Sequence, residues 1–537
     1  MSTHRNFDKI CVAVLVFTLL LTVLFMNGRR LGIEVVVDED DEAHSGTVYF
    51  TKNDLDGSWD SSGATVITLA GDAASVNGSG AYAHGGNVVI SNAGLYVLSG
   101  ALTDGSIIVD AHQNSKVWLL FDGVDVACSD DACLRVDKAD KVFLTLAEGS
   151  ENRLNGPVVF SDTAAADGTD GVIYAHDDLT INGDGSLTVN SWYRHGVVAK
   201  DDLVITGGTL AIRSQADGIR ANDSLRLCSA AVTVEAGDDG IAVSGEGGYF
   251  YMESGSLSVT SEDDALKAVG ALTILGGELA LTPVGDGISS DTSVCLAGGT
   301  ILIDNCYEGV EAPVIELSGG DVAIYPRDDG FNASASAISG STTPQVLISG
   351  GALTIVNTTA QDADGIDSNG DVLISGGVIR VSLPGAGTNN AIDFGSESGG
   401  VCSISGGSVI ACGSSNMAES FDDSSSQCSI FYNWSAARAA GTELSLIDGA
   451  GTVLVSWEVP CSFSSLTLSV PELQDGESYT LQLGGASEEV ALSGTVTTFG
   501  AQSAMGGMPG MGGAMPDRKS TRLNSSHPTT SRMPSSA

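Results

Sequence analysis

Basic residues are scarce in this chain of 537 residues, in which 23 Lys and Arg face 67 Asp and Glu, giving a formal net charge of −44. A protein that binds the phosphate backbone needs the opposite sign, so the composition excludes nucleic acid as a main partner. Aromatic residues make up only 6%, whereas glycine reaches 69 residues. This combination favours small, turn-rich repeats over a helical bundle. The sequence also lacks a P-loop, a nucleotide-binding fingerprint and a Ser/His/Asp order.

The sequence also gives little sign of a soft-metal site or of a disulfide framework. His176 and His195 have no partners at metal-ligand spacing, so we expect both at the surface. Of the ten cysteines, nine lie outside the first apolar segment, an odd number that cannot all pair with one another. The candidate pairs are Cys128 with Cys133 and Cys402 with Cys412, and the candidates for inward packing positions are Cys228 and Cys295.

Near the N-terminus, an apolar run of 17 residues extends from Ile10 to Met26. This length just spans a bilayer, and the following Asn-Gly-Arg-Arg contains no Ala-x-Ala-like cleavage site. We therefore expect residues 1–31 to be an uncleaved signal anchor, in preference to a cleaved signal peptide. An anchor would hold the protein in the plasma membrane, with residues 32–45 as an acidic linker at the cell surface.

At the other end, residues 501–516 form a flexible Met/Gly-rich tail. Residues 517–537 begin with DRKSTRLNSSH, which resembles the translation of a sequencing-adapter oligonucleotide. We expect this last segment to be an artefact and the natural C-terminus to be missing.

A short motif of an acid, a small residue and an apolar residue recurs along the middle of the chain, mostly 22 residues apart. A unit of this size is one turn of a solenoid. Alternating apolar strands flank Gly-Gly corners within the units, as in Leu203 to Ile212. The sequence therefore predicts an all-β fold, a right-handed parallel β-helix over residues 46–413. After residue 413 the period disappears, and residues 414–500 read as a small antiparallel β module with a turn at Asp448-Gly449.

The period places acids side by side. In a β-helix, residues one rung apart are about 5 Å apart, where carboxylates repel unless they are protonated or neutralised by a cation. Calcium takes oxygen ligands at about 2.3–2.6 Å and would resolve the repulsion. The alternative is turn chemistry, in which each Asp bonds its own backbone. The predicted calcium ligands are Asp217 with Asp238 and Asp239, Asp263 and Asp264 with Asp286, and a second set at strand exits, Asp201, Asp202 and Asp223.

Two basic and two aromatic residues are candidates for contacting a ligand. Arg220 and Lys267 lie three residues beyond ladder acids, where they either neutralise neighbouring Asp side chains or bind sugar carboxylates. Trp192 and Tyr193 either form a platform for sugar stacking or pack at a rung corner, and we prefer the packing interpretation.

Several motifs are shared with a known family: the opening Phe50-Thr51-x-x-Asp54-Leu55-Asp56-x-Ser58-Trp59-Asp60, then Ala139-Asp140-Lys141-Val142 with Leu146 to Asn152, Lys200-Asp201-Asp202-Leu203, and Asp217-Gly218-Ile219-Arg220 with Asp223-Ser224. With these motifs, residues 46–500 resemble exported, calcium-binding, carbohydrate-binding β-helix proteins whose fold is similar to that of family 9 pectate lyases. The resemblance implies binding of acidic polysaccharide such as polygalacturonate, and also of cellulose. His195, Ala265 and Ala242 depart from the family pattern.

Three functions are compatible with these features. The first is calcium-dependent, non-catalytic binding of acidic polysaccharide. The second is a calcium-dependent lyase, in which Lys267 would be the base that removes the proton next to a uronate carboxylate. The carboxylates around Lys267 raise its pKa and argue against that role. The third is a structural or adhesive wall protein in which calcium only stiffens the solenoid.

Overall fold

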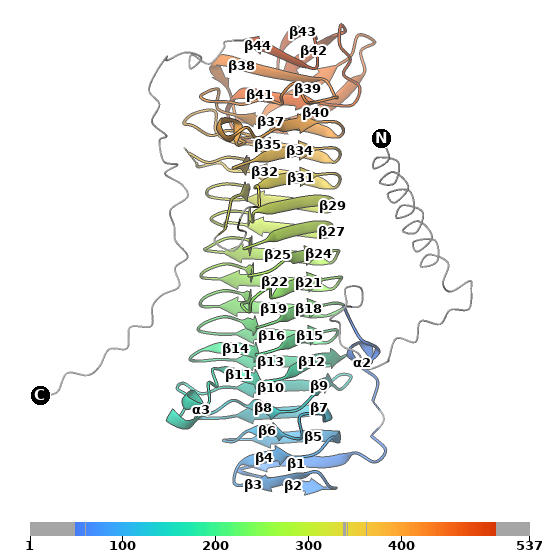
Figure 1. Ribbon diagram of the computed structural model, residues 1–537, viewed down its shortest axis with the longest axis vertical. Coiled ribbons are helices and arrows are strands. Elements are labelled where there is room, and N and C mark those ends of the chain that lie inside the picture. Colours follow the sequence, from blue (N-terminus) through green and yellow to red (C-terminus); the bar gives the residue numbers. More distant parts are fainter. Residues whose placement is uncertain (1–48, 60, 337–339, 341, 361, 501–537) are drawn as a thin grey trace, which may run out of the picture.

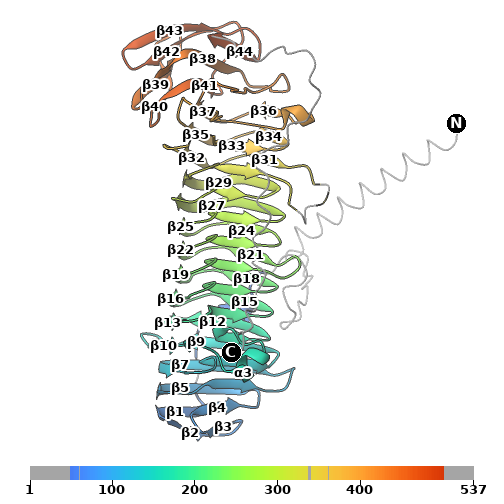
Figure 2. The same ribbon diagram turned by 90° about the vertical axis from the view of Figure 1, so that its left-hand side faces the viewer.

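The computed structural model describes residues 49–59, 61–336, 340, 342–360 and 362–500. Strands stack into one long rod, with rungs lying across the rod axis (Figure 1). The view turned by 90° shows the same stack from its side (Figure 2). Nearly every rung contributes three short strands that pair in parallel with the equivalent strands of the next rung. The predicted all-β parallel solenoid is therefore confirmed.

The rod has three faces, which we call sheets 1, 2 and 3. Sheet 1 contains β9 (Lys141–Leu146), β12 (Asp178–Gly183), β15 (Asp202–Ile205), β18 (Ser224–Leu227), β21 (Tyr249–Met252), β24 (Leu272–Ile274), β31 (Gln345–Ile348), β34 (Asp371–Ile374) and β36 (Cys402–Ile404). Sheet 2 contains β10 (Glu151–Asn155), β13 (Ser186–Asn190), β16 (Thr209–Arg213), β19 (Ala231–Ala236), β22 (Ser256–Ser261), β25 (Glu278–Pro283), β32 (Ala352–Val356), β35 (Val378–Ser382) and β37 (Ser408–Gly413). Four long strands run through both sheets and join them: β5 (Gly94–Leu102), β7 (Lys116–Ala127), β27 (Ser293–Asp304) and β29 (Val314–Tyr325).

Sheet 3 is the face that follows the repeated acidic motif. Its strands are β4 (Asn87–Ile90), β6 (Ile107–Asp110), β8 (Leu134–Lys138), β11 (Gly171–Ala175), β14 (His195–Ala199), β17 (Ile219–Ala221), β20 (Ile241–Val243), β23 (Leu266–Ala268), β26 (Ile288–Ser290), β28 (Val310–Glu311), β30 (Phe331–Ala333) and β33 (Ile366–Ser368).

Alternation along each strand builds the core. On sheet 3, the apolar residue of the repeated motif is aligned with its equivalent one rung away, so that Val197, Ile219, Ile241, Leu266 and Ile288 form one inward column. All five are fully buried. Such columns supply most of the hydrophobic stabilisation, at about 25 cal/mol per Å² of apolar surface removed from water.

Glycine makes the corner between sheets 1 and 2 tight. Gly208 has a φ of +81°, a conformation that residues with a Cβ rarely adopt, and a Cβ on Gly207 would lie 2.6 Å from the carbonyl oxygen of Gly183 in the previous rung. The Gly-Gly corner seen in the sequence is therefore required by both backbone conformation and rung stacking.

Antiparallel strands close the two ends of the rod. At the N-terminal end, β1 (Thr65–Gly71) pairs with β2 (Ala73–Asn77), and β3 (Ala81–His84) pairs with β4. At the other end, a module after β37 comprises β38 (Ser429–Arg438), β39 (Thr442–Ile447), β40 (Val453–Val459), β41 (Phe463–Ser469), β42 (Ser478–Leu483), β43 (Ala486–Ala491) and β44 (Val496–Gly500). Strands β39 and β40 form the hairpin predicted at Asp448. The few helical turns of the described residues are α2 (Lys52–Leu55), α3 (Asp162–Ala166) and η2 (Ser396–Ser398).

All nine cysteines of the described residues are free thiols. Neither Cys128 with Cys133 nor Cys402 with Cys412 forms a disulfide, and all four thiols are buried. Cys228 is buried as predicted. The inward position predicted for Cys295 is wrong, since its neighbours on β27, Val294 and Leu296, point inward instead.

Within the part of the chain that the structure describes, no helix is both long and apolar enough to cross a bilayer. The predicted anchor (1–31), acidic linker (32–45), Met/Gly-rich tail (501–516) and adapter-like segment (517–537) lie outside the described residues.

Candidate functional site

Acidic side chains line the corner just before sheet 3. We call this series the acid ladder; in chain order it consists of Asp217, Asp239, Asp264, Asp286, Glu308, Asp329 and Asp364, with His195 before it and Asn390 after it. A recurrent hydrogen bond joins its rungs. The backbone N–H of Asp286 donates to Oδ1 of Asp264 (2.8 Å), and that of Glu308 donates to Oδ1 of Asp286 (2.9 Å). These carboxylates therefore bond the neighbouring rung rather than their own turn, unlike ordinary Asp-Gly turns.

Two cations lie within the ladder. Lys267 Nζ is 2.8 Å from Oδ2 of Asp264 and 3.7 Å from Oδ2 of Asp239, and Arg220 Nη1 is 3.6 Å from Oδ2 of Asp217. Burial alone would lower the pKa of Lys267, but the carboxylates of Asp264 and Asp239 outweigh burial and raise the pKa far above its ordinary value. These contacts support the counter-ion interpretation of Arg220 and Lys267, while direct binding of sugar carboxylates by them stays a prediction.

Three groups of acids bring carboxylate oxygens within 4.8 Å of one another. We call them the first trio (Asp238, Asp239, Asp263), the second trio (Asp286, Glu308, Glu311) and the third trio (Asp329, Asp364, Asp367). The structure groups these acids differently from the predicted sets, and their binding of calcium stays a prediction. Asp217 and Asp264 are paired with Arg220 and Lys267, and Asp286 joins two glutamates of the following rung.

The second trio holds three half-buried carboxylates together, and no cation of the described residues lies in direct contact with them. Asn332 Nδ2 donates to Oε2 of Glu308 (2.9 Å), and Ser334 Oγ donates to Oε1 of Glu311 (3.2 Å). No Lys or Arg among the described residues forms an ion pair with any member of this trio. Burial, reinforced by repulsion from neighbouring acids such as Asp264, raises the pKa of Asp286 to about 8 and that of Glu311 above its ordinary value, although Lys267 opposes both rises. Burial and the charge of Asp286 raise the pKa of Glu308 well above its ordinary value. Oxygen donors in this arrangement suit a hard divalent cation.

The first trio is better compensated. The side chain of Asp239 is 13% exposed, and burial raises its pKa to about 8, although Lys267 opposes the rise. Burial and then the repulsion from Asp264 also raise the pKa of Asp263. Because Lys267 already supplies one positive charge here, the first trio has less need of a metal than the second.

Our prediction did not include the glutamates of the second trio or the aspartates of the third, although their spacing in the sequence indicates them. Glu308 and Glu311 are three residues apart, as are Asp364 and Asp367. On a rung, this spacing places one acid at the ladder corner and the other on the outer side of the sheet 3 strand that follows. The acid of the neighbouring rung completes each trio.

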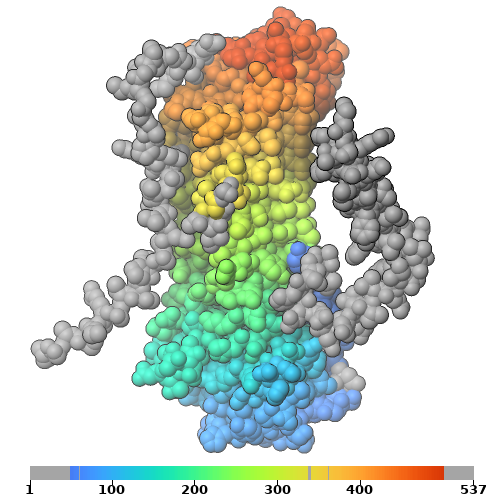
Figure 3. All heavy atoms as spheres, viewed as in Figure 1, coloured from blue at the N-terminus to red at the C-terminus, as the bar shows by residue number. Residues whose placement is uncertain are grey.

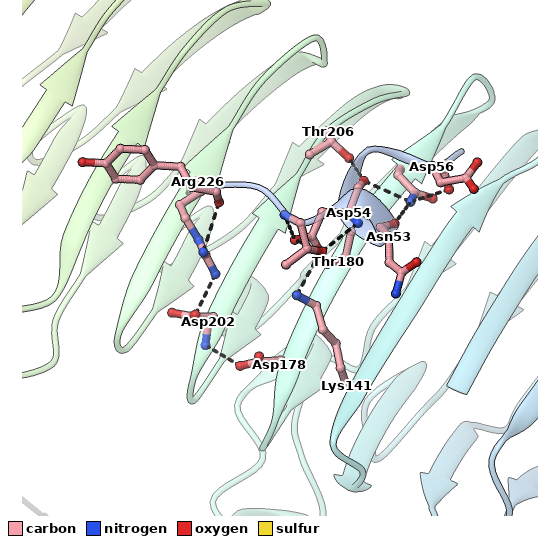
Figure 4. Close-up of polar contacts among 12 residues, drawn as sticks. Asn53, Asp54, Asp56, Lys141, Asp178, Thr180, Asp202, Thr206 and Arg226 are labelled. Carbon is pink, nitrogen blue, oxygen red and sulfur yellow. Dashed lines mark hydrogen bonds and ion pairs between the residues drawn. The ribbon is translucent and has the colours of Figure 1, made fainter. Parts of the chain in front are cut away.

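The predicted second set takes a different role. Asp202 is 7% exposed, accepts a hydrogen bond from Ser224 Oγ (2.7 Å) and lies 2.6 Å from Nη2 of the buried Arg226 (Figure 4). Asp201 and Asp223 lie at the surface nearby, where burial and then the charge of Asp223 raise the pKa of Asp201 to about 6. Among the described residues, this set is not one of the groups whose ligand oxygens all lie within 4.8 Å of one another, and Asp202 already has a cation, so calcium binding by the set stays a prediction.

Arg226 and Asp202 form part of a docking site for residues 49–59, which we call the N-terminal arm. Arg226 Nη1 donates to the carbonyl oxygen of Tyr49 (3.1 Å), and the ring of Tyr49 stacks on that of Tyr251 with centroids 3.6 Å apart. In the space-filling view, part of this blue segment lies against green rungs, away from the other blue atoms at the end of the rod (Figure 3).

Asp54 fixes the middle of the arm. Its side chain is fully buried, lies 2.8 Å from Nζ of Lys141 and accepts a hydrogen bond from Thr180 Oγ1 (2.6 Å) (Figure 4). Burial alone would raise the pKa of Asp54, but Lys141 and these hydrogen bonds outweigh burial and lower it. This ion pair brings together two of the sequence motifs, because Asp54 belongs to the Phe-Thr-x-x-Asp opening and Lys141 to the Ala-Asp-Lys-Val motif.

His195 corrects a further expectation. It is buried rather than at the surface, and its Nδ1 accepts the backbone N–H of Asp217 (3.1 Å). Burial lowers its pKa to about 4. A neutral imidazole thus takes the place of a ladder carboxylate, because it offers the same acceptor to the next rung. His176 is exposed, as predicted.

Trp192 and Tyr193 lie just before His195, with 56% and 44% of their surface exposed. Both rings are more exposed than full packing at a rung corner would leave them, and their role as a sugar platform stays a prediction.

Known proteins resemble parts of this chain. A family model described as "Carbohydrate-binding domain-containing protein" matches residues 84–330 and 281–430, which together span well over half of the chain. A protein of that description from Acetivibrio thermocellus is 29% identical over 219 residues, covering 40% of this chain and 77% of the relative. A solved structure, "Structure of the polysaccharide lyase-like protein from C. thermocellum, Gadolinium derivative", is 25% identical with a TM-score of 0.39, covering 48% of this chain and 93% of that one. From the extent of the family match, this chain belongs to the family of carbohydrate-binding domain-containing proteins.

Proposed function

We propose that this protein binds acidic polysaccharide of the polygalacturonate type without cleaving it, through calcium held by the acid ladder. The observation that carries the proposal is the second trio, in which three carboxylates offer oxygen atoms within 4.8 Å of one another and, among the described residues, form no ion pair with Lys or Arg. Calcium bound there would relieve the repulsion and keep coordination positions for sugar carboxylates, since calcium takes six to eight oxygen ligands. The family membership supports a carbohydrate as the partner. Cellulose is a further candidate from the resemblance, and the apolar run in residues 1–31 supports a place at the cell surface.

A lyase is the less favoured alternative. Its candidate base, Lys267, lies between two carboxylates that keep it protonated, whereas a general base must be unprotonated to accept a proton. Within the ladder, Lys267 therefore supports a binding role better than a catalytic one.

Calcium dependence is the direct test of this function. With the full chain, we expect polygalacturonate to bind in calcium and its affinity to fall by about tenfold or more in chelator, because each lost charge-assisted contact costs a kcal/mol or more. Isothermal titration calorimetry would measure both affinities. An affinity that chelator leaves unchanged would refute the bridging role of the metal.

The trios differ in their expected contributions to calcium binding. Glu308→Gln removes one charge from the second trio and should weaken calcium binding by about tenfold, because carboxylate number sets calcium affinity. Asp239→Asn should have a smaller effect, because Lys267 already compensates the first trio. Asp321→Asn, an exposed acid on sheet 2, is the matched control. Calorimetric titration with calcium alone would check this order, and equal affinities in all three variants would mean that the trios do not hold the ion.

A further inference from the structure

An exposed apolar patch lies next to the cationic end of the acid ladder. It consists of Val158, Val159, Trp192 and Tyr193, and we call it the aromatic patch; its exposed fractions are 72%, 56%, 56% and 44%. The two segments that form it follow β10 and β13 on adjacent rungs, where the N–H of Gly156 donates to the carbonyl oxygen of Asn190 (2.9 Å).

The patch is held in place by its neighbours. The ring of Tyr193 lies 6.3 Å from that of Phe160, which is 7% exposed and so provides a buried support. The carbonyl oxygen of Arg194 accepts hydrogen bonds from Ser191 Oγ (3.0 Å) and from the N–H groups of Gln215 and Ala216 in the next rung (both 3.2 Å). The exposed rings are therefore presented on a fixed backbone, which lowers the entropic cost of binding a ligand.

Positive charge gathers beside the patch. The guanidinium of Arg194 lies 5.6 Å from the centroid of the Tyr193 ring, and Arg194 is exposed without an ion pair among the described residues. Lys200 and Arg220 also lie close to His195, and both are partly exposed. Lys200 lies 4.0 Å from the carboxylate of Asp170, and Arg220 lies 3.6 Å from that of Asp217. Three of the 23 basic residues thus meet around one corner of a strongly acidic protein.

We infer that Trp192, Tyr193 and Arg194 form a calcium-independent subsite for one uronate residue of an acidic polysaccharide. The aromatic rings offer a flat surface to the apolar C–H face of the sugar, and the planar guanidinium of Arg194 pairs with the carboxylate of the same residue. The inference rests on the proposed function, because it takes the same polymer as the ligand. The patch continues into the ladder, since Asp217 lies one rung from His195 and Asp239 one rung further. A single chain lying along the corner would therefore contact the cationic subsite first and the trios after it.

The occupant follows from the combination of groups. A neutral sugar would use the rings but leave the charge of Arg194 unmatched, and a large protein partner would need far more apolar surface than four side chains supply. A ring that carries one carboxylate satisfies both the aromatic and the cationic groups.

Binding in chelator isolates this subsite from the trios. With the full chain, we expect wild type to retain weak affinity for polygalacturonate in chelator, Trp192→Ala to reduce that affinity by about tenfold and Arg194→Gln by about fivefold. Trp192→Phe should recover most of the loss. Fully methyl-esterified polygalacturonate should respond to Trp192→Ala but not to Arg194→Gln, since its carboxylates are blocked. Tyr325→Ala and Arg153→Gln, both exposed on sheet 2, are the matched controls, and unchanged melting temperatures would show that the variants are folded.

The outcomes separate this inference from the proposed function. Chelator-resistant binding that falls in Trp192→Ala and Arg194→Gln but not in Glu308→Gln supports the subsite. Absence of chelator-resistant binding, or equal affinities in Trp192→Ala, Arg194→Gln and the controls, would overturn the subsite while leaving the calcium-dependent site standing. Equal losses for polygalacturonate and a neutral glucan in Trp192→Ala, with no effect of Arg194→Gln, would overturn the assignment to a uronate.

Discussion

Replacing Lys141 by Met is expected to destabilise the docked N-terminal arm by about 3–5 kcal/mol, because Asp54 would remain fully buried without its cation. Methionine keeps the apolar length of the side chain, so the loss reports the charge rather than the packing. Because residues in a solenoid mainly stabilise their neighbours, we expect residues 49–59 to open before the rungs separate. Hydrogen exchange should therefore lose protection at the amide of Leu55, which donates to Thr51 in the arm.

Two further variants define the cause of this loss. Asp54→Asn in the Lys141→Met background removes the unpaired charge and should restore part of the protection, since an amide still accepts from Thr180. Lys138→Met changes an exposed lysine of β8 and should have little effect. Unchanged exchange at Leu55 in Lys141→Met would show that the ion pair does not hold the arm.

Without calcium, the protein is expected to melt at lower temperature as the pH is raised from about 5 to 9. Burial raises the pKa of Asp217 to about 6 and those of Asp239 and Asp286 to about 8, whereas an unfolded chain has values near 4. Between about pH 4 and pH 8 the folded protein then binds more protons than the unfolded chain, so the free energy of unfolding falls as pH rises. The combined loss is of the order of several kcal/mol and should be complete above about pH 8.

Calcium should act in the opposite direction. Because calcium binds deprotonated carboxylates, the increase in melting temperature that it produces should be small near pH 5 and largest above pH 8. Differential scanning calorimetry in chelator and in calcium would measure both curves, and Asp286→Asn should flatten the chelator curve. A melting temperature that rises with pH in chelator would mean that the ladder carboxylates are solvated and ionised throughout.

The fold was readable from the sequence because its stabilising pattern is local. Each rung repeats an acid, a small residue and an inward apolar residue such as Ile219 or Ile241. The register between neighbouring strands then follows, because equivalent residues of successive rungs stack on one another. The Gly207-Gly208 corner is equally visible, since few other residues fit the backbone there.

The site was less predictable because it depends on side-chain directions across rungs. The period placed Asp239, Asp264 and Asp286 in one column, but it did not show that Lys267 would take two of these acids as partners. The arm was not predictable from a pattern at all, since Asp54 meets Thr180 across 126 residues of sequence. The exposure of Trp192 was not predictable, because an aromatic side chain in a small-residue repeat suits either a corner or a surface, and only the folded chain shows that about half of its surface is exposed.

The path of the N-terminal arm has a mechanical consequence. The arm lies across consecutive rungs, from Tyr251 on β21 and Arg226 on β18 to Lys141 on β9. A load applied to the chain before Tyr49 would therefore be shared in shear by an aromatic stack, a buried guanidinium and a buried ion pair. Only after these contacts failed would tension reach β1 and peel the solenoid from its end, one rung at a time. Because the arm is attached along the side of the rod, its contacts protect the first rungs from force applied at the N-terminus.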